Sequence, residues 1–167
     1  MIKAFIEIPL DSKYKYELDK ETNLLILDRP LNQHIPQNYG FIPETLAEDG
    51  DPLDVFVITI FPLIPGALHK ILPMGIMICK DNGINDHKII ATLVDENSAF
   101  YWNVELDLIK IYLQTYKQGF EYELYAGEIH ALQEIKTCQE AYMSNLNSIK
   151  SNTCELKYTS STHKPNE

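Results

Sequence analysis

The chain has 167 residues, of which 45% are hydrophobic and 23% charged, and its net charge is −10. This composition is that of one globular domain and excludes wholesale disorder. The negative net charge argues against a nucleic-acid-binding protein and against binding to an anionic membrane surface.

The N-terminal part of the chain is predicted to form strands. Residues 2–9 have the composition of a strand, and residues 13–18 alternate strictly between two faces. Residues 24–28 give another strand after a polar turn at 19–23. The strands at 13–18 and 24–28 are therefore predicted to pair as a β-hairpin.

The middle of the chain combines an irregular segment with further strands. Residues 30–54 hold four of the nine prolines and are expected to be extended and irregular. Residues 55–60 are apolar and rich in β-branched side chains, which predicts a buried strand. Residues 70–80 and 87–94 predict two more strands, joined by a polar turn that contains Gly83.

The C-terminal part is predicted to be mainly helical. Apolar residues recur at helical spacing over 104–112, with Asn103 as the expected N-cap. Residues 120–127 predict one more strand, and a second helical stripe extends from residue 132 to residue 149. From Ser151 onward the chain is polar, and residues 151–167 are expected to form a flexible tail.

The order of these elements, strands first and helices late, predicts an α+β fold with a small barrel or curled sheet. Residues 1–150 are expected to form a single domain. The three cysteines form no CxxC pair and the histidines have no metal-ligand spacing, which disfavours a disulfide framework and a zinc site. With Glu7 too early for a signal peptide, and no apolar run approaching the ~20 residues of a spanning helix, we expect a soluble, cytoplasmic protein.

The most informative segment is EDGDPLDVFV at residues 48–57, which holds Asp49, Asp51 and Asp54. Carboxylates so close together repel one another unless a cation lies among them, and their oxygens are the ligands that Mg²⁺ and Mn²⁺ prefer. A solvated acidic turn is the alternative, since Asp-Gly and Asp-Pro are turn formers. The rigid strand that follows favours a functional site at the end of that strand.

Other candidate residues have plain alternatives. Asp81 and Asp86 lie between Lys80 and Lys88 in what could be an ordinary charged hairpin turn. Arg29, the only arginine, could form a salt bridge or bind a phosphate through two hydrogen bonds. The remaining candidates could also have purely structural roles. Lys15 and Glu17 could be solvated strand residues, Tyr39 could pack in a turn, and Tyr116 and Lys117 could end a helix.

Taken together, these segments resemble the family I soluble inorganic pyrophosphatases. The resemblance extends from about Glu7 to the last helix. It rests on the ordered set IEIP, KYE, LDR, NYGFIP, EDGDPLDV, the loop with Asp81, Asp86 and Lys88, and the Tyr116-Lys117 pair. The D-G-D-P-x-D core matches the signature of that family in full.

The resemblance implies a closed five-stranded, OB-like β-barrel with flanking helices, including a C-terminal helix. It also implies hydrolysis of pyrophosphate to two phosphates, dependent on several Mg²⁺ ions that Mn²⁺ could replace. A homo-oligomer is implied as well, most often a hexamer, with neither a nucleic acid nor a membrane as partner.

The resemblance also implies roles for individual residues. Asp51 would be the general base for the attacking water. The metal ligands would be Asp49, Asp54, Asp81 and Asp86. The groups that hold phosphate oxygens would be Lys15, Arg29, Tyr39, Tyr116 and Lys117. The residues that orient waters and lysines around them would be Glu7, Glu17 and Lys88.

The chain departs from the family pattern at a few positions. Asn82 stands where the family has an acidic residue, Ile35 stands where many members have Tyr, and the loop after Lys117 is short and lacks a further lysine. These departures keep a second hypothesis open, a catalytically weakened homologue that binds phosphate or a partner protein. A third, an OB-type nucleic-acid binder, is disfavoured by the net charge of −10.

Overall fold

The computed structural model describes residues 1–19, 21–22, 24–94, 102–116 and 118–159, with the backbone alone at residues 102, 116 and 151–159. The strands within these ranges are β1 (Lys3–Ile8), β2 (Tyr14–Leu18), β3 (Leu25–Pro30), β4 (Asn38–Phe41), β5 (Asp54–Ile58), β6 (Leu68–Asp81), β7 (Ile84–Asn85), β8 (Lys88–Leu93) and β9 (Phe120–Gly127). The helices are α1 (Trp102–Tyr116) and α2 (Glu128–Thr159).

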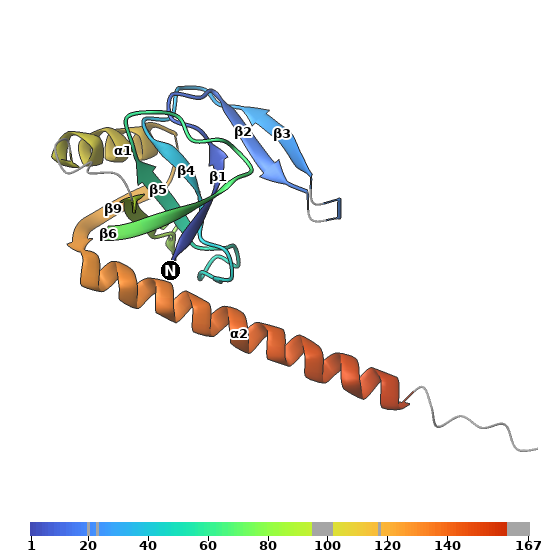
Figure 1. The fold of residues 1–167 in the computed structure, drawn as a ribbon. Coiled ribbons are helices and arrows are strands. Elements are labelled where there is room, and N and C mark those ends of the chain that lie inside the picture. The colour runs from blue at the N-terminus through green and yellow to red at the C-terminus, as the bar shows by residue number, and fades with distance from the viewer. Residues whose placement is uncertain (20, 23, 95–101, 117, 160–167) are drawn as a thin grey trace, which may run out of the picture.

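Five of these strands close into a barrel (Figure 1). β1 pairs with β4, β4 with β5, β8 with β6, and β6 pairs back with β1, all antiparallel, while β5 and β8 are parallel. β9 and β7 extend the sheet along β6. The hairpin of β2 and β3 stands beside the barrel as a separate two-stranded sheet. The α+β fold with a closed five-stranded barrel is thus confirmed.

Closure of the barrel depends on the long strand β6, which bends and so pairs with several strands. Its first residues pair with β1, its middle with β8 and its last part with β9. The register shifts between Pro73 and Gly75, so a β-bulge lies at the bend. Proline suits a bulge because it has no N–H to donate to the ladder. The hydroxyl of Tyr125 donates a hydrogen bond to the carbonyl of Met74 at 3.1 Å and covers the bulge.

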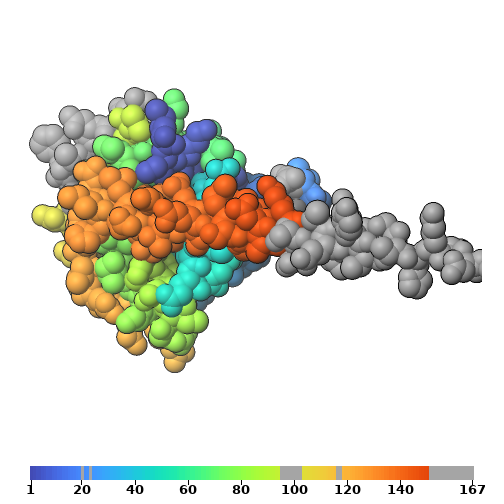
Figure 2. Space-filling model, turned by 90° about the horizontal axis from the view of Figure 1, so that it is seen from below, coloured from blue at the N-terminus to red at the C-terminus, as the bar shows by residue number. Residues whose placement is uncertain are grey.

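Both faces of β5 are buried, which explains its continuous apolar sequence. Val55 and Val57 belong to a core that includes the first turns of α2, which lies across one face of the body (Figure 2). Phe56 and Ile58 belong to a second core on the other face, closed by α1. The helical residues that complete the two cores are Ala131, Ile135 and Cys138 from α2 and Ile109, Tyr112 and Leu113 from α1.

The structure corrects the sequence prediction in the irregular segment 30–54. That segment contains β4, which pairs with β1 and β5. No local sequence pattern predicts this pairing. The buried side chain of Asn38 supports it, because its carbonyl oxygen accepts hydrogen bonds from the N–H groups of Leu10 and Leu63, at 2.9 and 2.7 Å.

The helix ends also differ from the prediction. α1 begins at Trp102, so Asn103 lies inside the helix and does not cap it. α2 continues through Ser151 to Thr159, because residues 128–159 contain neither glycine nor proline and polar composition alone does not end a helix. Residues 151–159 of the expected tail are therefore helical, whereas residues 160–167 lie outside the described residues. Neither described helix is long and apolar enough to cross a membrane.

Gly40 provides a test of this packing, since a β-carbon there would lie 1.8 Å from the carbonyl oxygen of Phe5 on β1. We expect Gly40→Ala to lower the free energy of unfolding by about 3 kcal/mol, because β1 and β4 would have to separate. Urea denaturation measures the change. Gly127→Ala is the matched control, since its β-carbon would meet no atom within 4 Å. Equal stability of the two variants would contradict the close approach of β1 and β4.

Candidate active site

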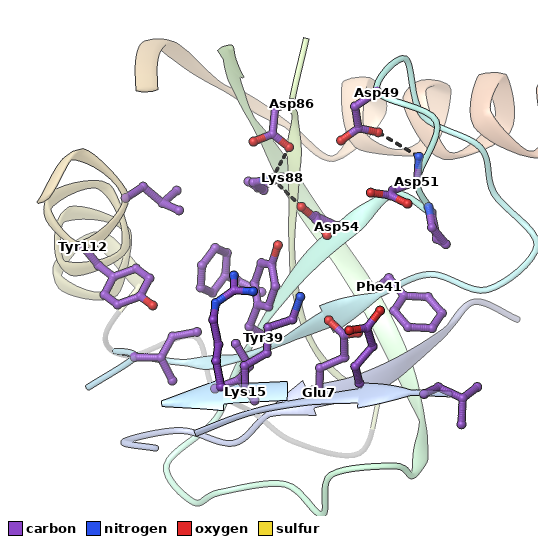
Figure 3. A pocket seen from close by; sticks show the side chains of 18 residues that line it. Glu7, Lys15, Tyr39, Phe41, Asp49, Asp51, Asp54, Asp86, Lys88 and Tyr112 are labelled. Carbon is purple, nitrogen blue, oxygen red and sulfur yellow. Dashed lines mark hydrogen bonds and ion pairs between the residues drawn. The ribbon is translucent and has the colours of Figure 1, made fainter. Parts of the chain in front are cut away.

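Most of the predicted site residues meet at one pocket of about 340 Å³ at the barrel (Figure 3). Its charged side chains come from segments far apart in the sequence. The carboxylates that line it are Glu7, Glu17, Asp49, Asp51, Asp54 and Asp86. The cations are Lys15, Arg29 and Lys88, and Tyr39 is a further lining residue.

The loop before β5 brings Asp49 and Asp51 to the pocket through a tight turn. The N–H of Ala47 donates to the carbonyl of Asp51 at 2.8 Å, and the N–H of Asp51 donates to the Asp49 carboxylate at 3.0 Å. Gly50 has a φ of 90°, which glycine adopts at little cost. Thr45 joins the loop to β5, since its hydroxyl oxygen accepts the N–H of Leu53 at 2.8 Å. The two aspartates are therefore held by backbone hydrogen bonds.

Asp54 and Lys88 are register partners on the parallel strands β5 and β8, so their side chains leave the sheet on the same side. The Lys88 ammonium group forms ion pairs with both Asp54 and Asp86, and only 1% of its side chain is exposed. Burial by itself lowers the pKa of Lys88, but the charges and hydrogen bonds of the two carboxylates outweigh it, so the pKa is raised. Lys88 is therefore charged and compensates part of the negative charge of the pocket.

Glu7 lies at a register shift of β1, between Ile6 and Ile8. Such a bulge redirects a side chain, and here it accompanies a carboxylate that lines the pocket. Burial raises the pKa of Glu7 to about 7, the charge of Lys15 opposes the rise, and Asp54 adds to it. Glu7 therefore shares one electrostatic environment with both the cations and the aspartates.

The pKa values of Tyr39 and Asp49 are both raised, first by burial and then by the negative charge around them. Burial raises the pKa of the Tyr39 hydroxyl well above its usual range, and the charge of Asp54 raises it further. Burial also raises the pKa of Asp49, and the charges of Asp86, Asp54 and Asp51 add to the rise, against a hydrogen bond from the Asp51 N–H. The Asp49 carboxylate is thus destabilised by burial and by its acidic neighbours.

The hairpin of β2 and β3 carries two of the cations. Lys15 and Arg29 are register partners, and both lie near Asp28, with nitrogen to oxygen distances of 4.0 and 2.9 Å. In Figure 3 Lys15 and Glu7 lie across the pocket from Asp49, Asp51, Asp54 and Asp86. A polyanion in the pocket could contact Lys15 and Arg29 directly. It could approach the aspartates only if cations lay between its own negative charges and theirs.

The donor set fits a hard divalent cation. Every carboxylate that lines the pocket offers oxygen ligands, and carboxylates outnumber cationic side chains. No three aspartate, glutamate, histidine or cysteine side chains in the described part of the chain already form a metal-binding group. With Lys88 between Asp54 and Asp86, the aspartates would have to rearrange when a metal binds.

One described residue among those predicted, Asp81, is not brought to the pocket, and two others cannot be placed because their side chains fall outside the described part of the chain. Asp81 is at the end of β6 and is not a lining residue, and its carboxylate accepts a hydrogen bond from Asn82 at 2.8 Å. Asn82 and Gly83 form the turn to β7 with φ values of 50° and 84°, and Asn tolerates this conformation better than Glu. The side chain of Tyr116 and all of Lys117 lie outside the described residues.

The structure adds residues that the sequence did not indicate. Tyr112 of α1 and Phe41 of β4 line the pocket. Tyr112 was part of an apolar helical stripe, which predicts a core position, and it does belong to the core around α1. Phe41 lies opposite Asp54 in the ladder of β4 and β5, a pairing visible only in the fold.

Comparison with known proteins agrees with this geometry. The family model described as "Inorganic pyrophosphatase" matches residues 4–150. The chain is 45% identical over 125 residues to inorganic pyrophosphatase 1 of Pseudomonas syringae pv. tomato, covering 72% of this chain and 71% of that one. It is 40% identical to the inorganic pyrophosphatase of Nanoarchaeum equitans, covering 84% and 97% of the two chains.

Solved structures give the same result. The crystal structure of inorganic pyrophosphatase from Thermus thermophilus matches with a TM-score of 0.78 and 30% identity, covering 84% of this chain and 90% of that one. The structure from Coxiella burnetii matches with a TM-score of 0.76 and 32% identity, covering 84% and 94% of the two chains. The resemblance seen in the sequence motifs is thereby confirmed, and this chain belongs to the inorganic pyrophosphatase family.

Proposed function

We propose that this protein hydrolyses pyrophosphate to two phosphates with the help of bound Mg²⁺. The observation that carries the proposal is the meeting of four aspartates, from the segment 49–54 and from Asp86, with Lys15 and Arg29 in one pocket. A site that takes both a polyanion and divalent cations needs oxygen ligands for the metal and cationic groups for the phosphate. This pocket offers both.

The aspartates would bind the metal ions. Oxygen ligands would come from Asp49, Asp54 and Asp86, and from Asp81 as the family resemblance implies. Bound Mg²⁺ would neutralise charge on pyrophosphate and lower the pKa of the attacking water. Mn²⁺ has the same preference for carboxylate oxygens and could replace Mg²⁺.

Asp51 would act as the general base. Its carboxylate lies in the pocket beside those of Asp49 and Asp54, on a loop held by backbone hydrogen bonds. The carboxylate would take the proton of the attacking water while the water oxygen bonds to one phosphorus atom. The bond from that phosphorus to the bridging oxygen would break, and two phosphates would result.

The cationic groups would hold the phosphate oxygens. Lys15 and Arg29 lie side by side on the hairpin, and Tyr39 carries a hydroxyl donor from β4. The roles that the resemblance adds are phosphate contacts from Tyr116 and Lys117, and orientation of waters and lysines by Glu7, Glu17 and Lys88. Such groups stabilise charge on the leaving phosphate without changing place during the reaction.

The partners and location follow from the same proposal. We propose a homo-oligomer, a hexamer in the first place. The exposed apolar side chains of α1, Val104, Leu108 and Ile111, support an interface on that helix because they recur on one face. The buried thiols of Cys79 and Cys138, neither of which is in a disulfide, are consistent with a reducing cytoplasm.

Release of phosphate tests the proposal directly. We expect the protein to release phosphate from pyrophosphate in the presence of Mg²⁺ and to stop when EDTA removes the metal. A colorimetric phosphate assay measures the rate. No release at any Mg²⁺ concentration would reject the proposal in favour of a weakened homologue that only binds phosphate or a partner.

Two isosteric variants separate the proposed roles. We expect Asp54→Asn to weaken Mg²⁺ binding more than Asp51→Asn, because Asp54 would ligate the metal and Asp51 would take a proton. Asp51→Asn should leave Mg²⁺ binding nearly intact and lower kcat by ~10²–10⁴-fold. Calorimetric titration with Mg²⁺ and initial rates decide the matter. A larger loss of Mg²⁺ affinity in Asp51→Asn would mean that the roles are exchanged.

A further inference from the structure

A hydrogen bond joins the two acidic segments of the pocket, through the residues that precede Asp49 and Asp86 in the sequence. The side-chain amide of Asn85 donates to the carboxylate of Glu48, with a nitrogen to oxygen distance of 2.6 Å. Glu48 immediately precedes Asp49, and Asn85 immediately precedes Asp86. The bond therefore spans two segments that are 37 positions apart in the chain.

The pair lies on the opposite side of these segments from the pocket. Asp49 and Asp86 line the active-site pocket, whereas Glu48 and Asn85 line a second cavity of about 370 Å³, which α2 also borders. In the second segment the residues alternate, because Asn85 faces the second cavity and Asp86 the first. The Glu48–Asn85 bond thus ties the two segments together without entering the active-site pocket.

The Asp86 segment is itself fixed to β6. The N–H of Asp86 donates to the carbonyl of Cys79 at 3.0 Å, and the thiol of Cys79 donates to the carbonyl of Asp86 at 2.9 Å. The Glu48–Asn85 bond extends this anchor to the segment that carries Asp49. Without such a link, repulsion between the carboxylates of Asp49 and Asp86 would favour a wider separation of the segments.

We propose that Glu48 and Asn85 are positioning residues for the metal ligands. Their hydrogen bond sets the spacing of the Asp49 and Asp86 segments, so that the backbone of both segments is already in place when the aspartate side chains rearrange around Mg²⁺. The inference rests on the proposed function. It concerns two residues to which the sequence analysis gave no role. They would act through their neighbours, because neither side chain lines the active-site pocket.

Asn85→Ala provides the main test, because it removes the hydrogen bond without changing the net charge. Titration calorimetry of the substrate-free protein with Mg²⁺ should show binding weakened roughly 10-fold, as for other groups that orient metal ligands. The denaturant midpoint in EDTA should stay close to that of the wild type, because Glu48 is exposed and Asn85 only half-buried. Gln139→Ala, on the exposed side of α2, is the matched control and should change neither quantity.

A swapped pair tests the bond itself. In the double variant Glu48→Gln, Asn85→Asp the donor and the acceptor exchange places while the net charge and the side-chain lengths are kept. Mg²⁺ affinity should return to within about 3-fold of the wild type, since the hydrogen bond can form again. A role confined to folding or to local charge would not predict this rescue.

The outcomes separate this inference from the proposed function. The positioning role would be overturned if Asn85→Ala bound Mg²⁺ as tightly as the wild type, or if the swapped pair failed to restore a lost affinity. The proposed function would still stand in either case, provided that the wild type releases phosphate. A wild-type protein that neither binds Mg²⁺ nor releases phosphate would overturn both. Weaker Mg²⁺ binding with unchanged stability, restored by the swapped pair, supports the inference.

Discussion

Repulsion among carboxylates is the constraint on which the site depends. Asp49, Asp51, Asp54 and Asp86 are held around one pocket, where burial raises the pKa of Asp49 and the charges of the other three aspartates add to the rise. A folded chain can keep such a cluster only if rigid elements hold it and cations compensate it. Here the barrel and its loop hydrogen bonds provide the rigidity, and Lys88 provides a buried cation within the protein. Divalent cations would provide the rest.

The architecture explains how the cluster can be held. β5 and β8 are parallel neighbours with both faces buried, and each begins at the pocket, β5 with Asp54 and β8 with Lys88. The acidic loops directly precede these strands, so the fixed distance between β5 and β8 also fixes the distance between the loops. The cationic hairpin of β2 and β3 lies outside the barrel ladder, so the cations proposed to bind phosphate and the aspartates proposed to bind metal come from different parts of the fold. Metals and phosphate would therefore meet in the pocket and stabilise each other's binding.

Much of this could be predicted from the sequence because the information is local. The alternation at residues 13–18, the apolar run at 55–60 and the aspartate motif at 48–54 each reflect short-range patterns, and the structure has a strand or a loop there. The helical stripes likewise predicted α1 and α2. Motif order along the chain then pointed to the family, and through it to the closed barrel.

Other features depend on contacts between distant segments and left no local signal. β4 exists because β1 and β5 flank it, and Gly40 is needed where the β1 backbone passes close by. The same holds for the Glu48–Asn85 bond, since neither residue type is distinctive in its own segment. Asp81 illustrates the opposite case, because a motif placed it with the metal ligands while the turn at Asn82 and Gly83 leaves it outside the pocket lining.

Coupling between metal and substrate tests the central claim most directly. A pocket with more carboxylates than cationic side chains should reject a pyrophosphate analogue unless Mg²⁺ is present. Titration calorimetry with methylenediphosphonate, which is not hydrolysed, measures this with Mg²⁺ and with EDTA. We expect binding to be at least ~10-fold tighter with Mg²⁺, in line with the size of ordinary binding couplings. Equal affinity under the two conditions would contradict the view that divalent cations complete this site.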